Sequence, residues 1–495
     1  MAAPIHIIQN EGGTIMASNN SDIVQPTAAP TTTALPVPSL FAPFVAKSPL
    51  TVMTRALLER TLQPDVLDQL FLDHARCQIN HELLFSSVVD LFSQVALRIN
   101  PSIRQAYLNN PQHQSVSLGA LYQKINHLEP PLGPALVRYS AHHMQEIIAA
   151  VGGVFPPWRQ GYRLKVLDGN HFSGTHHRLK ILRGMPAAAL PGQVLAVLDP
   201  RQHLFLDLIP CEDAYTQERV LLAWVLPQVE TKDIWVADRN FCTPKCLTGI
   251  DKRHGFFAIR EHQQLNIRYV GDLLALGRCA TGVVFEQQAE VADEQTNQSV
   301  VVRRVLVQLD KPTRDGDAEV SVLSNLPVEV ADGIAIAVLY LDRWTIETAF
   351  AELTVVLRCE IETLGYPRAA LFSFAVAVLA ANLLGAVRAV LGSERGAFTV
   401  KEELSVFQEA TDIAGVYKGM MIAIPVPEWR FWATMSLPEF VDAMRCLAGK
   451  VDWQHLQKTY ASPKKPPQKR PSARQQPHVS TQRLLNQAKE RNKQN

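Results

Sequence analysis

Several features that mark specialised classes of protein are scarce in this sequence. Its 495 residues include only 7 cysteines, an odd number at uneven spacings, which excludes a disulfide framework and fits a reducing compartment. No basic segment leads into an apolar run at the N-terminus, so the pattern of a signal peptide is missing. The apolar, uncharged run at residues 371–387 has 17 residues and is shorter than the roughly 20 that span a bilayer. We therefore expect a cytoplasmic protein without a membrane segment, in which this run forms a buried core helix.

A net charge is also nearly absent, since 48 Lys and Arg balance 47 Asp and Glu. The balance hides an uneven distribution, because residues 458–495 contain ten Lys or Arg and a single acid. Seven of the 32 prolines fall in residues 1–50 and five in the basic segment. This composition predicts disordered tails at 1–50 and 458–495. The basic tail is either a solvated end or a segment that is attracted to DNA phosphate whatever the base sequence.

Between the tails lies a body of ordinary globular composition. Residues 51–155 show helical spacing of apolar side chains, which suits a DNA-reading helix pair or, more simply, a helical bundle. Residues 156–261 alternate between strand and helix patterns and predict a mixed α/β sheet. Residues 262–330 are rich in strand patterns, and residues 331–457 are helical again. The fold class is therefore α/β, with a helical N-terminal domain and a β-rich insertion between two halves of the α/β domain.

Two acids stand at the ends of predicted strands. Asp168 ends an alternating strand and precedes the polar turn Gly169–Asn170, and Asp238 follows a wholly apolar strand at 234–237. Functional groups of open α/β sheets gather at such strand ends. For either acid alone, a turn-stabilising role is the simpler explanation of the pattern.

A third group of polar residues lies on a predicted helix. Tyr340, Arg343 and Glu347 follow at i, i+3 and i+7, so one helical face presents a phenol, a guanidinium and a carboxylate. The simpler interpretation is a surface ion pair between Arg343 and Glu347. The neighbouring Trp344 and Ile346 predict instead a largely buried helix, in which a carboxylate needs a partner or a metal.

Other metal sites are less well supported. His171, His176 and His177 beside Asp168 suggest zinc, but tightly spaced histidines of this kind fit exposed or phosphate-facing imidazoles better. Cys242 and a second cysteine four residues later lack the further pair of a zinc finger and are predicted to be buried thiols.

Three carboxylates from two strand ends and one helix provide hard oxygen ligands for Mg²⁺, with Mn²⁺ as a substitute. Two such ions about 3.5–4 Å apart activate a water or a 3′-hydroxyl and stabilise the leaving oxygen of a phosphodiester. On the same face, Arg343 is placed to hold the phosphate. The pattern therefore predicts metal-dependent cleavage of nucleic acid.

The surroundings of the three acids resemble a known family. Asp168 lies in LDGNHF, Asp238 in VADRNF and Glu347 in YLDRWTIETAF. This order resembles the DDE transposases of bacterial insertion sequences, especially the "IS-four" group, whose last acid stands in Y-x-x-R-x-x-x-E-x-x-x-x-x-x-K. The stretches LSNLP at 323–327 and NLL at 382–384 resemble that group as well, and the resemblance covers residues 55–450.

The resemblance implies an RNase H-like mixed sheet interrupted by the β-rich insertion. It implies Asp168, Asp238 and Glu347 as the metal-binding catalytic acids, and Tyr340 and Arg343 as contacts to DNA phosphate near the cut. It also implies that the helical N-terminal domain binds the terminal inverted repeats of the element, and that a homodimer cuts two ends together.

One position departs from the family pattern. The Lys expected seven residues after Glu347 is Thr354, which carries no charge. Arg358 lies one helical turn further on, about 6 Å away by helix rise, and is predicted to replace it as a DNA contact.

The resulting hypothesis is a bacterial transposase, cytoplasmic and nucleoid-associated when it acts, that cuts the ends of its own insertion sequence and joins the 3′-hydroxyl ends to target DNA. Two alternatives stay open. A nuclease on the same site would hydrolyse DNA without joining it, and an inactive descendant would bind the ends without needing a metal.

Overall fold

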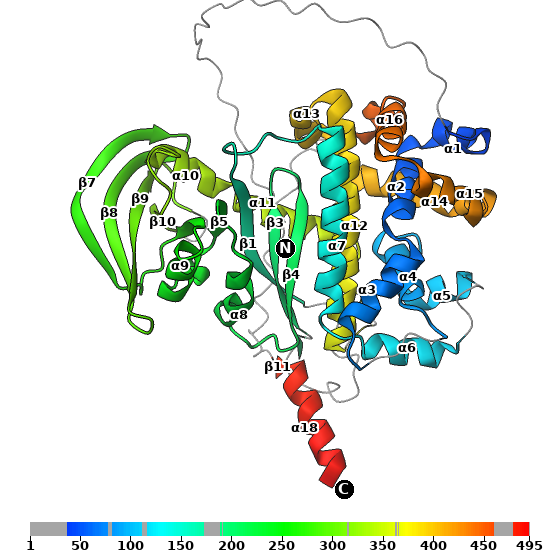
Figure 1. The fold of residues 1–495 in the computed structure, drawn as a ribbon, viewed down its shortest axis with the longest axis horizontal. Helices are drawn as coiled ribbons and strands as arrows, with labels where there is room; N and C mark the ends of the chain where they lie inside the picture. Colours follow the sequence, from blue (N-terminus) through cyan, green and yellow to red (C-terminus); the bar gives the residue numbers. More distant parts are fainter. Residues whose placement is uncertain are drawn as a thin grey trace, which may run out of the picture.

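The computed structural model describes residues 37–77, 82–110, 116–172, 189–190, 192–313, 316–361, 364, 366–459 and 479–494. These residues form an α/β body with a large sheet on one side and a layer of helices on the other (Figure 1). Residues 1–36 of the predicted N-terminal tail lie outside the described residues. The rest of that tail is helical, since η1 (Ser39–Phe41) and α1 (Ala42–Lys47) lead into α2 (Pro49–Thr61). The folded body thus begins before residue 51. Pro43 and Pro49 are compatible with these helices because they stand in the first helical turns, where no N–H is needed.

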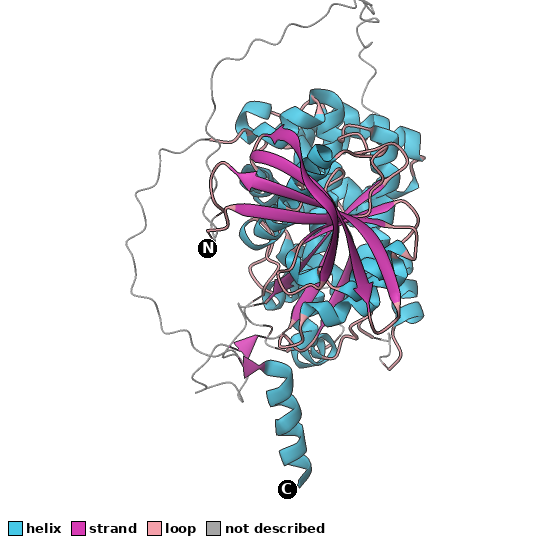
Figure 2. Cartoon of the chain, turned by 90° about the vertical axis from the view of Figure 1, so that its left-hand side faces the viewer, coloured by secondary structure: helices cyan, strands magenta, loops and turns pink. Residues whose placement is uncertain are grey.

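A mixed sheet of nine strands runs through the body in the order β4-β3-β1-β5-β6-β10-β9-β8-β7 and is strongly twisted (Figure 2). The strands are β1 (Arg163–His171), β3 (Gln193–Asp199), β4 (Leu204–Cys211), β5 (Asp233–Ala237), β6 (Phe256–Arg260), β7 (Ile267–Cys279), β8 (Gly282–Asp293), β9 (Gln298–Leu309) and β10 (Glu319–Ser324). β1 is antiparallel to β3 and parallel to β5, and β5 is parallel to β6. The mixed α/β fold class predicted from the sequence is confirmed.

The central strand β5 is buried along its whole length because helices cover both faces of the sheet. On one face Trp235 packs among residues of α8 (Glu218–Val225) and α9 (Pro244–Asp251), and η4 (Leu226–Gln228) follows α8. On the other face Val236 belongs to the larger core that includes α7 (Leu132–Val151), α11 (Trp344–Val355) and α12 (Pro367–Arg395). Side chains that alternate along β5 therefore pack into two separate hydrophobic cores, one on each face of the sheet.

The predicted β-rich insertion contains β7, β8, β9 and β10. It is continuous with the core sheet, because Val322 to Ser324 of β10 pair with β6 in antiparallel register. The four strands form the curved end of the sheet at the left of Figure 1.

The helices before and after the sheet share one hydrophobic core. The N-terminal set continues with α3 (Pro64–His74), α4 (Phe85–Ala96), α5 (Ile103–Asn109) and α6 (Leu118–Asn126), and the C-terminal set has α13 (Ala397–Glu403), α14 (Val406–Ala423), α15 (Val426–Thr434), α16 (Leu437–Ala448) and α17 (Trp453–Leu456). α2 packs against α14 and α15, and α7 lies along α12 (Figure 1). Residues 51–155 are thus helical where they are described, as predicted, and their helices pack against those of the C-terminal half.

The apolar run at 371–387 lies in α12, which is long and apolar enough to cross a membrane by length and composition. Of its most apolar window, 94% is buried inside the protein. The polar Asn382 is accommodated in this buried helix by two hydrogen bonds. Its side chain accepts from the backbone N–H of Phe205 at 2.8 Å and donates to the carbonyl of the same residue at 2.9 Å. The run is the buried core helix that the sequence predicted.

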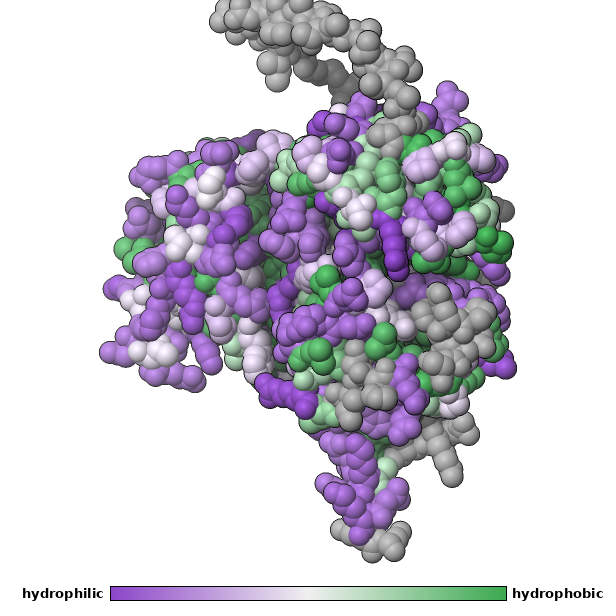
Figure 3. Space-filling view, turned by 45° about the vertical axis from the view of Figure 1, so that its right-hand side comes forward, coloured by the Kyte–Doolittle hydropathy of each residue, from purple (hydrophilic) through white to green (hydrophobic). Residues whose placement is uncertain are grey.

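The end of the chain differs from the predicted disordered tail. β11 (Val479–Ser480) pairs in parallel with β2 (Ala189–Leu190), and α18 (Thr481–Gln494) projects from the body with a hydrophilic surface (Figures 1 and 3). The hydroxyl of Ser480 donates to Asp213 at 2.7 Å, which ties the strand to the body. All prolines of the basic segment precede Val479, so nothing in the local sequence prevents a helix after it.

Candidate active site

Asp168 and Asp238 stand side by side at one end of two parallel strands. β1 pairs with β5 as far as Leu167 and Ala237, and each acid is the next residue in its chain. Neighbouring strands are about 4.8 Å apart, and residues of equal register point to the same face of a sheet. Pairing of β1 with β5 ends where the acids begin, so the two carboxylates lie at the opening between the strands.

β1 itself does not end at Asp168 as the sequence suggested. It continues beside β3 to His171, because β3 offers an antiparallel partner beyond the last contact with β5. The carboxylate of Asp168 accepts a hydrogen bond from the backbone N–H of Gly169 at 2.9 Å. Asp238 is the N-cap residue of the short helix η5 (Arg239–Phe241). One acid is thus held within a strand and the other at a strand–helix junction.

The third acid comes from a helix pair and not from the single helix that the sequence suggested. Tyr340 lies at the end of α10 (Gly333–Leu341), and Arg343 is the N-cap of α11, whose first turn contains Glu347. Arg343 keeps helical backbone angles, φ −53° and ψ −38°, so the three side chains still share one side. The expected burial is only partial: Ile346 is fully buried, whereas Trp344 is 49% exposed.

The guanidinium of Arg343 lies between two of the acids. Its Nη1 is 2.7 Å from Oε1 of Glu347 and 3.7 Å from Oδ2 of Asp168. Its guanidinium carbon, Cζ, lies 4.4 Å from the ring centroid of Trp344. The side chain is 9% exposed, and its Nε has no hydrogen-bond partner among the described residues. The Arg343–Glu347 contact is therefore part of a largely buried cluster and not an isolated surface ion pair.

Burial and charge shape the titration of this cluster. Burial raises the pKa of Asp168 to about 6, opposed by the Gly169 hydrogen bond and by Arg343 and reinforced by Glu218 and Glu347. Burial also raises the pKa of Tyr340, against the effect of Arg343, and Asp238 adds to the increase. Raised pKa values of neighbouring groups at a strand end are typical of functional sites.

The donor set fits a hard divalent cation, since all three acids offer carboxylate oxygens. As the side chains lie, no three acidic, His or Cys groups of the described residues are placed together so as to hold a metal ion. The cation that stands between Asp168 and Glu347 is the guanidinium of Arg343. These two acids thus already share a positive charge at the position where a metal is expected.

The structure adds one acid that the sequence reasoning missed. Glu218, the first residue of α8, approaches from the opposite face of the sheet and lies under Gly169, while Asn240 donates a hydrogen bond to its Oε2 at 2.6 Å. The Nδ1 of His171 lies 3.9 Å from its Oε1. The helix dipole is enough to explain an acid in a first helical turn, so no sequence pattern marks this placement.

Other predicted residues lie apart from the acids. The guanidinium of Arg358 donates to the carbonyl of Pro101, and its own backbone follows the end of α11 at Val355. The expected helical face from Glu347 to Arg358 is therefore interrupted. Thr354 is exposed and its hydroxyl donates to the carbonyl of Phe350 at 2.9 Å. Of the three histidines considered for zinc, only His171 is among the described residues, and Cys242 is a buried free thiol as predicted.

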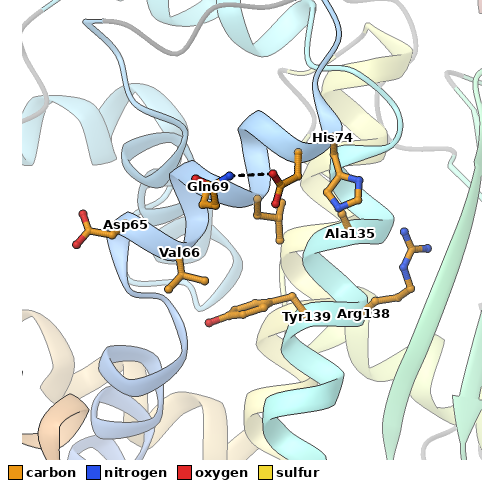
Figure 4. A pocket seen from close by; sticks show the side chains of 9 residues that line it. Asp65, Val66, Gln69, His74, Ala135, Arg138 and Tyr139 are labelled. Carbon is orange, nitrogen blue, oxygen red and sulfur yellow. Dashed lines mark hydrogen bonds between the residues drawn. The ribbon is translucent and has the colours of Figure 1, made fainter.

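One pocket lies beside the cluster of acids, and a second lies away from it. One of about 410 Å³ begins at Arg239, next to Asp238, and is also lined by Arg260 and Arg304. Another of about 500 Å³ lies between α3 and α7, where Tyr139 and His74 are among its lining residues (Figure 4). None of the predicted site residues lines the second pocket, so it is separate from the acid cluster.

Comparison with known proteins finds a match for the segment that contains this site. Residues 159–383 match the family model of the transposase DDE domain. This segment contains Asp168, Asp238 and Glu347, and its match to a transposase DDE domain agrees with the resemblance seen in the sequence. The chain is also similar to a solved structure, a piggyBac transposase synaptic complex with hairpin DNA, at 9% identity and a TM-score of 0.37, over 79% of this chain and 82% of that one. No curated protein matches the sequence.

Proposed function

We propose that this protein is the transposase of a bacterial insertion sequence, which cuts DNA at the ends of its own element and joins the 3′-hydroxyl ends to target DNA. The observation that carries the proposal is the convergence of Asp168, Asp238 and Glu347 around Arg343 within a transposase DDE domain. In the strand order β4-β3-β1-β5-β6 only β3 runs antiparallel to the other four strands, which supports an RNase H-like core.

The three acids are the residues that would hold Mg²⁺, or Mn²⁺ in its place. When bound, such ions activate the attacking water or 3′-hydroxyl and neutralise charge on the leaving oxygen. The raised pKa of Asp168 means that the buried carboxylate gains from a cation close by.

The contacts of Arg343 support a role in holding DNA phosphate. Burial disfavours its charge, but the neighbouring Tyr340, Glu347 and Asp238 outweigh that effect and raise the pKa of the guanidinium. Its buried Nε has no acceptor among the described residues, and a phosphate oxygen is an acceptor that suits it. We assign Tyr340 and Arg343 to the phosphate beside the cut; for Arg358 a DNA contact stays a prediction.

One exposed cation near Asp238 supports the same substrate. Arg239 follows the acid directly and lines a pocket in which Arg260 and Arg304 are already paired with Asp317 and Glu261. Phosphate contacts of this kind position a nucleic acid without reading its sequence. The helical region 51–155 is the proposed reader of the terminal repeats, and a homodimer in the DNA complex would bring two ends together.

Strand transfer separates this proposal from the alternatives. We expect purified protein to convert a labelled linear DNA that carries the element's end, in Mg²⁺ and with a supercoiled target, into a joined product. Nicked DNA without joined product would favour the nuclease. Retarded DNA that is never cut would favour the inactive descendant.

A further inference from the structure

Glu218 occupies a position that links the segments of two predicted catalytic acids. An ideal Cβ on Gly169 would lie 1.9 Å from Oε1 of Glu218, so the carboxylate lies directly against the residue that follows Asp168. Its other oxygen, Oε2, accepts the 2.6 Å hydrogen bond from Asn240, two residues after Asp238. One side chain therefore touches both strand ends.

The N-terminus of α8 favours an acid at Glu218 and the Nδ1 of His171 lies 3.9 Å from its Oε1, but neither contact accounts for its approach to the two strand ends. Its side chain is 17% exposed, and no Lys or Arg forms an ion pair with it among the described residues. A partly buried carboxylate beside a second acid is unfavourable unless the arrangement serves something else. The absence of a Cβ at Gly169 is what leaves room for it, although this residue lies inside a strand, where glycine is unfavourable.

We propose that Glu218 is a positioning residue for the cleavage reaction, which fixes the Asp238 turn relative to the Asp168 strand through Asn240 and Gly169. The inference rests on the proposed function, since it concerns the spacing of the same acids. Because Glu218 approaches from the α8 face and the acids face α11, it acts from beneath the site. Its hydrogen bond, and not its charge, carries the effect.

The hydrogen bond and the charge are separated by two substitutions. Glu218→Gln keeps an oxygen that can accept from Asn240, whereas Glu218→Ala removes it. We expect single-turnover cleavage of an end substrate to stay within about threefold of wild type for Gln. For Ala it should fall about 10–100-fold, the range for residues that orient metal ligands, with unchanged DNA affinity. Equal losses for both variants would show that the charge matters, and an unaffected Ala variant would show that Glu218 positions nothing; either result overturns the proposal.

Gly169 provides an independent test that does not depend on removing Glu218. Gly169→Ala places a methyl group on the carboxylate and should slow cleavage as Glu218→Ala does. The double variant Gly169→Ala/Glu218→Ala should be no slower than either single variant, because the two changes remove the same contact. Additive losses would contradict the shared contact.

Two controls keep these results interpretable. Mn²⁺ binding, followed by the loss of the free-ion EPR signal, should weaken for Glu218→Ala and not for Glu218→Gln; equal binding by both would contradict positioning of the metal ligands. Asp168→Asn, measured alongside, reports on the proposed function itself. If wild type does not cut or Asp168→Asn does, the proposed function fails, whereas a normal Glu218→Ala with an inactive Asp168→Asn refutes this inference alone.

Discussion

The helix that bears Glu347 is tied to the helical layer by a buried ion cluster, and breaking it should be costly. Arg388 of α12 donates to Oε2 of Glu409 from Nε at 3.0 Å and from Nη2 at 2.8 Å, and to Glu352 of α11 at 2.9 Å. The side chain of Glu409 is 0% exposed. Arg388→Met would leave that carboxylate buried without a counterion, which typically costs about 3–5 kcal/mol of the free energy of unfolding.

Urea unfolding at pH 7 measures this cost, and two variants control it. Glu352→Gln should lose no more than about 1 kcal/mol, because that side chain is 31% exposed. Arg388→Met/Glu409→Leu should regain most of the loss, since the uncompensated charge is gone. Burial raises the pKa of Glu409 even with Arg388 present, so the penalty in Arg388→Met should shrink as pH falls and the carboxyl group takes up a proton. A loss below about 1 kcal/mol for Arg388→Met, or no recovery in the double variant, would refute this reasoning.

Three further results are expected. The folded-state pKa of Asp168 is about 6, above its unfolded value, so ionisation of this carboxyl group reduces stability as pH rises through that range. Asp168→Asn should therefore raise the melting temperature of EDTA-treated protein more at pH 7.5 than at pH 5. An equal shift at both pH values would contradict this expectation. Asn382→Ala should lower the free energy of unfolding by about 1–3 kcal/mol in urea titrations, because it leaves the buried backbone groups of Phe205 unpaired, and a neutral effect would count against that brace. Deletion of 458–495 removes ten cations and should weaken DNA binding on every sequence with a shallower dependence on salt, whereas equal salt slopes would show that the tail does not touch phosphate.

The main parts of the site follow from local sequence patterns. An unbroken apolar strand before Asp238 and an alternating one before Asp168 predict two strand ends, and parallel pairing then brings the acids together. The spacing of Tyr340, Arg343 and Glu347 survives the break between α10 and α11 because the intervening residues keep helical angles. Periodicity carries this information since it depends only on residues close in the chain.

Features that depend on distant parts of the chain were not predictable. Glu218 belongs to the site through contacts with Gly169 and Asn240, which no periodicity records. The pairing of β10 with β6 makes the insertion an extension of the core sheet, and strand patterns alone do not choose partners. Arg358 was placed by extrapolating α11, but that helix ends at Val355, and tertiary contact with Pro101 determines where the guanidinium lies.

The most direct test of the central claim is Mg²⁺-dependent cleavage of the element's end by Asp168→Asn, Asp238→Asn and Glu347→Gln, with DNA binding followed by gel shift on the same fragment. If the three carboxylates hold the catalytic metal, each variant should bind the end like wild type and fail to cut it. Cleavage at the wild-type rate by any one of them would remove that residue from the site and contradict the account.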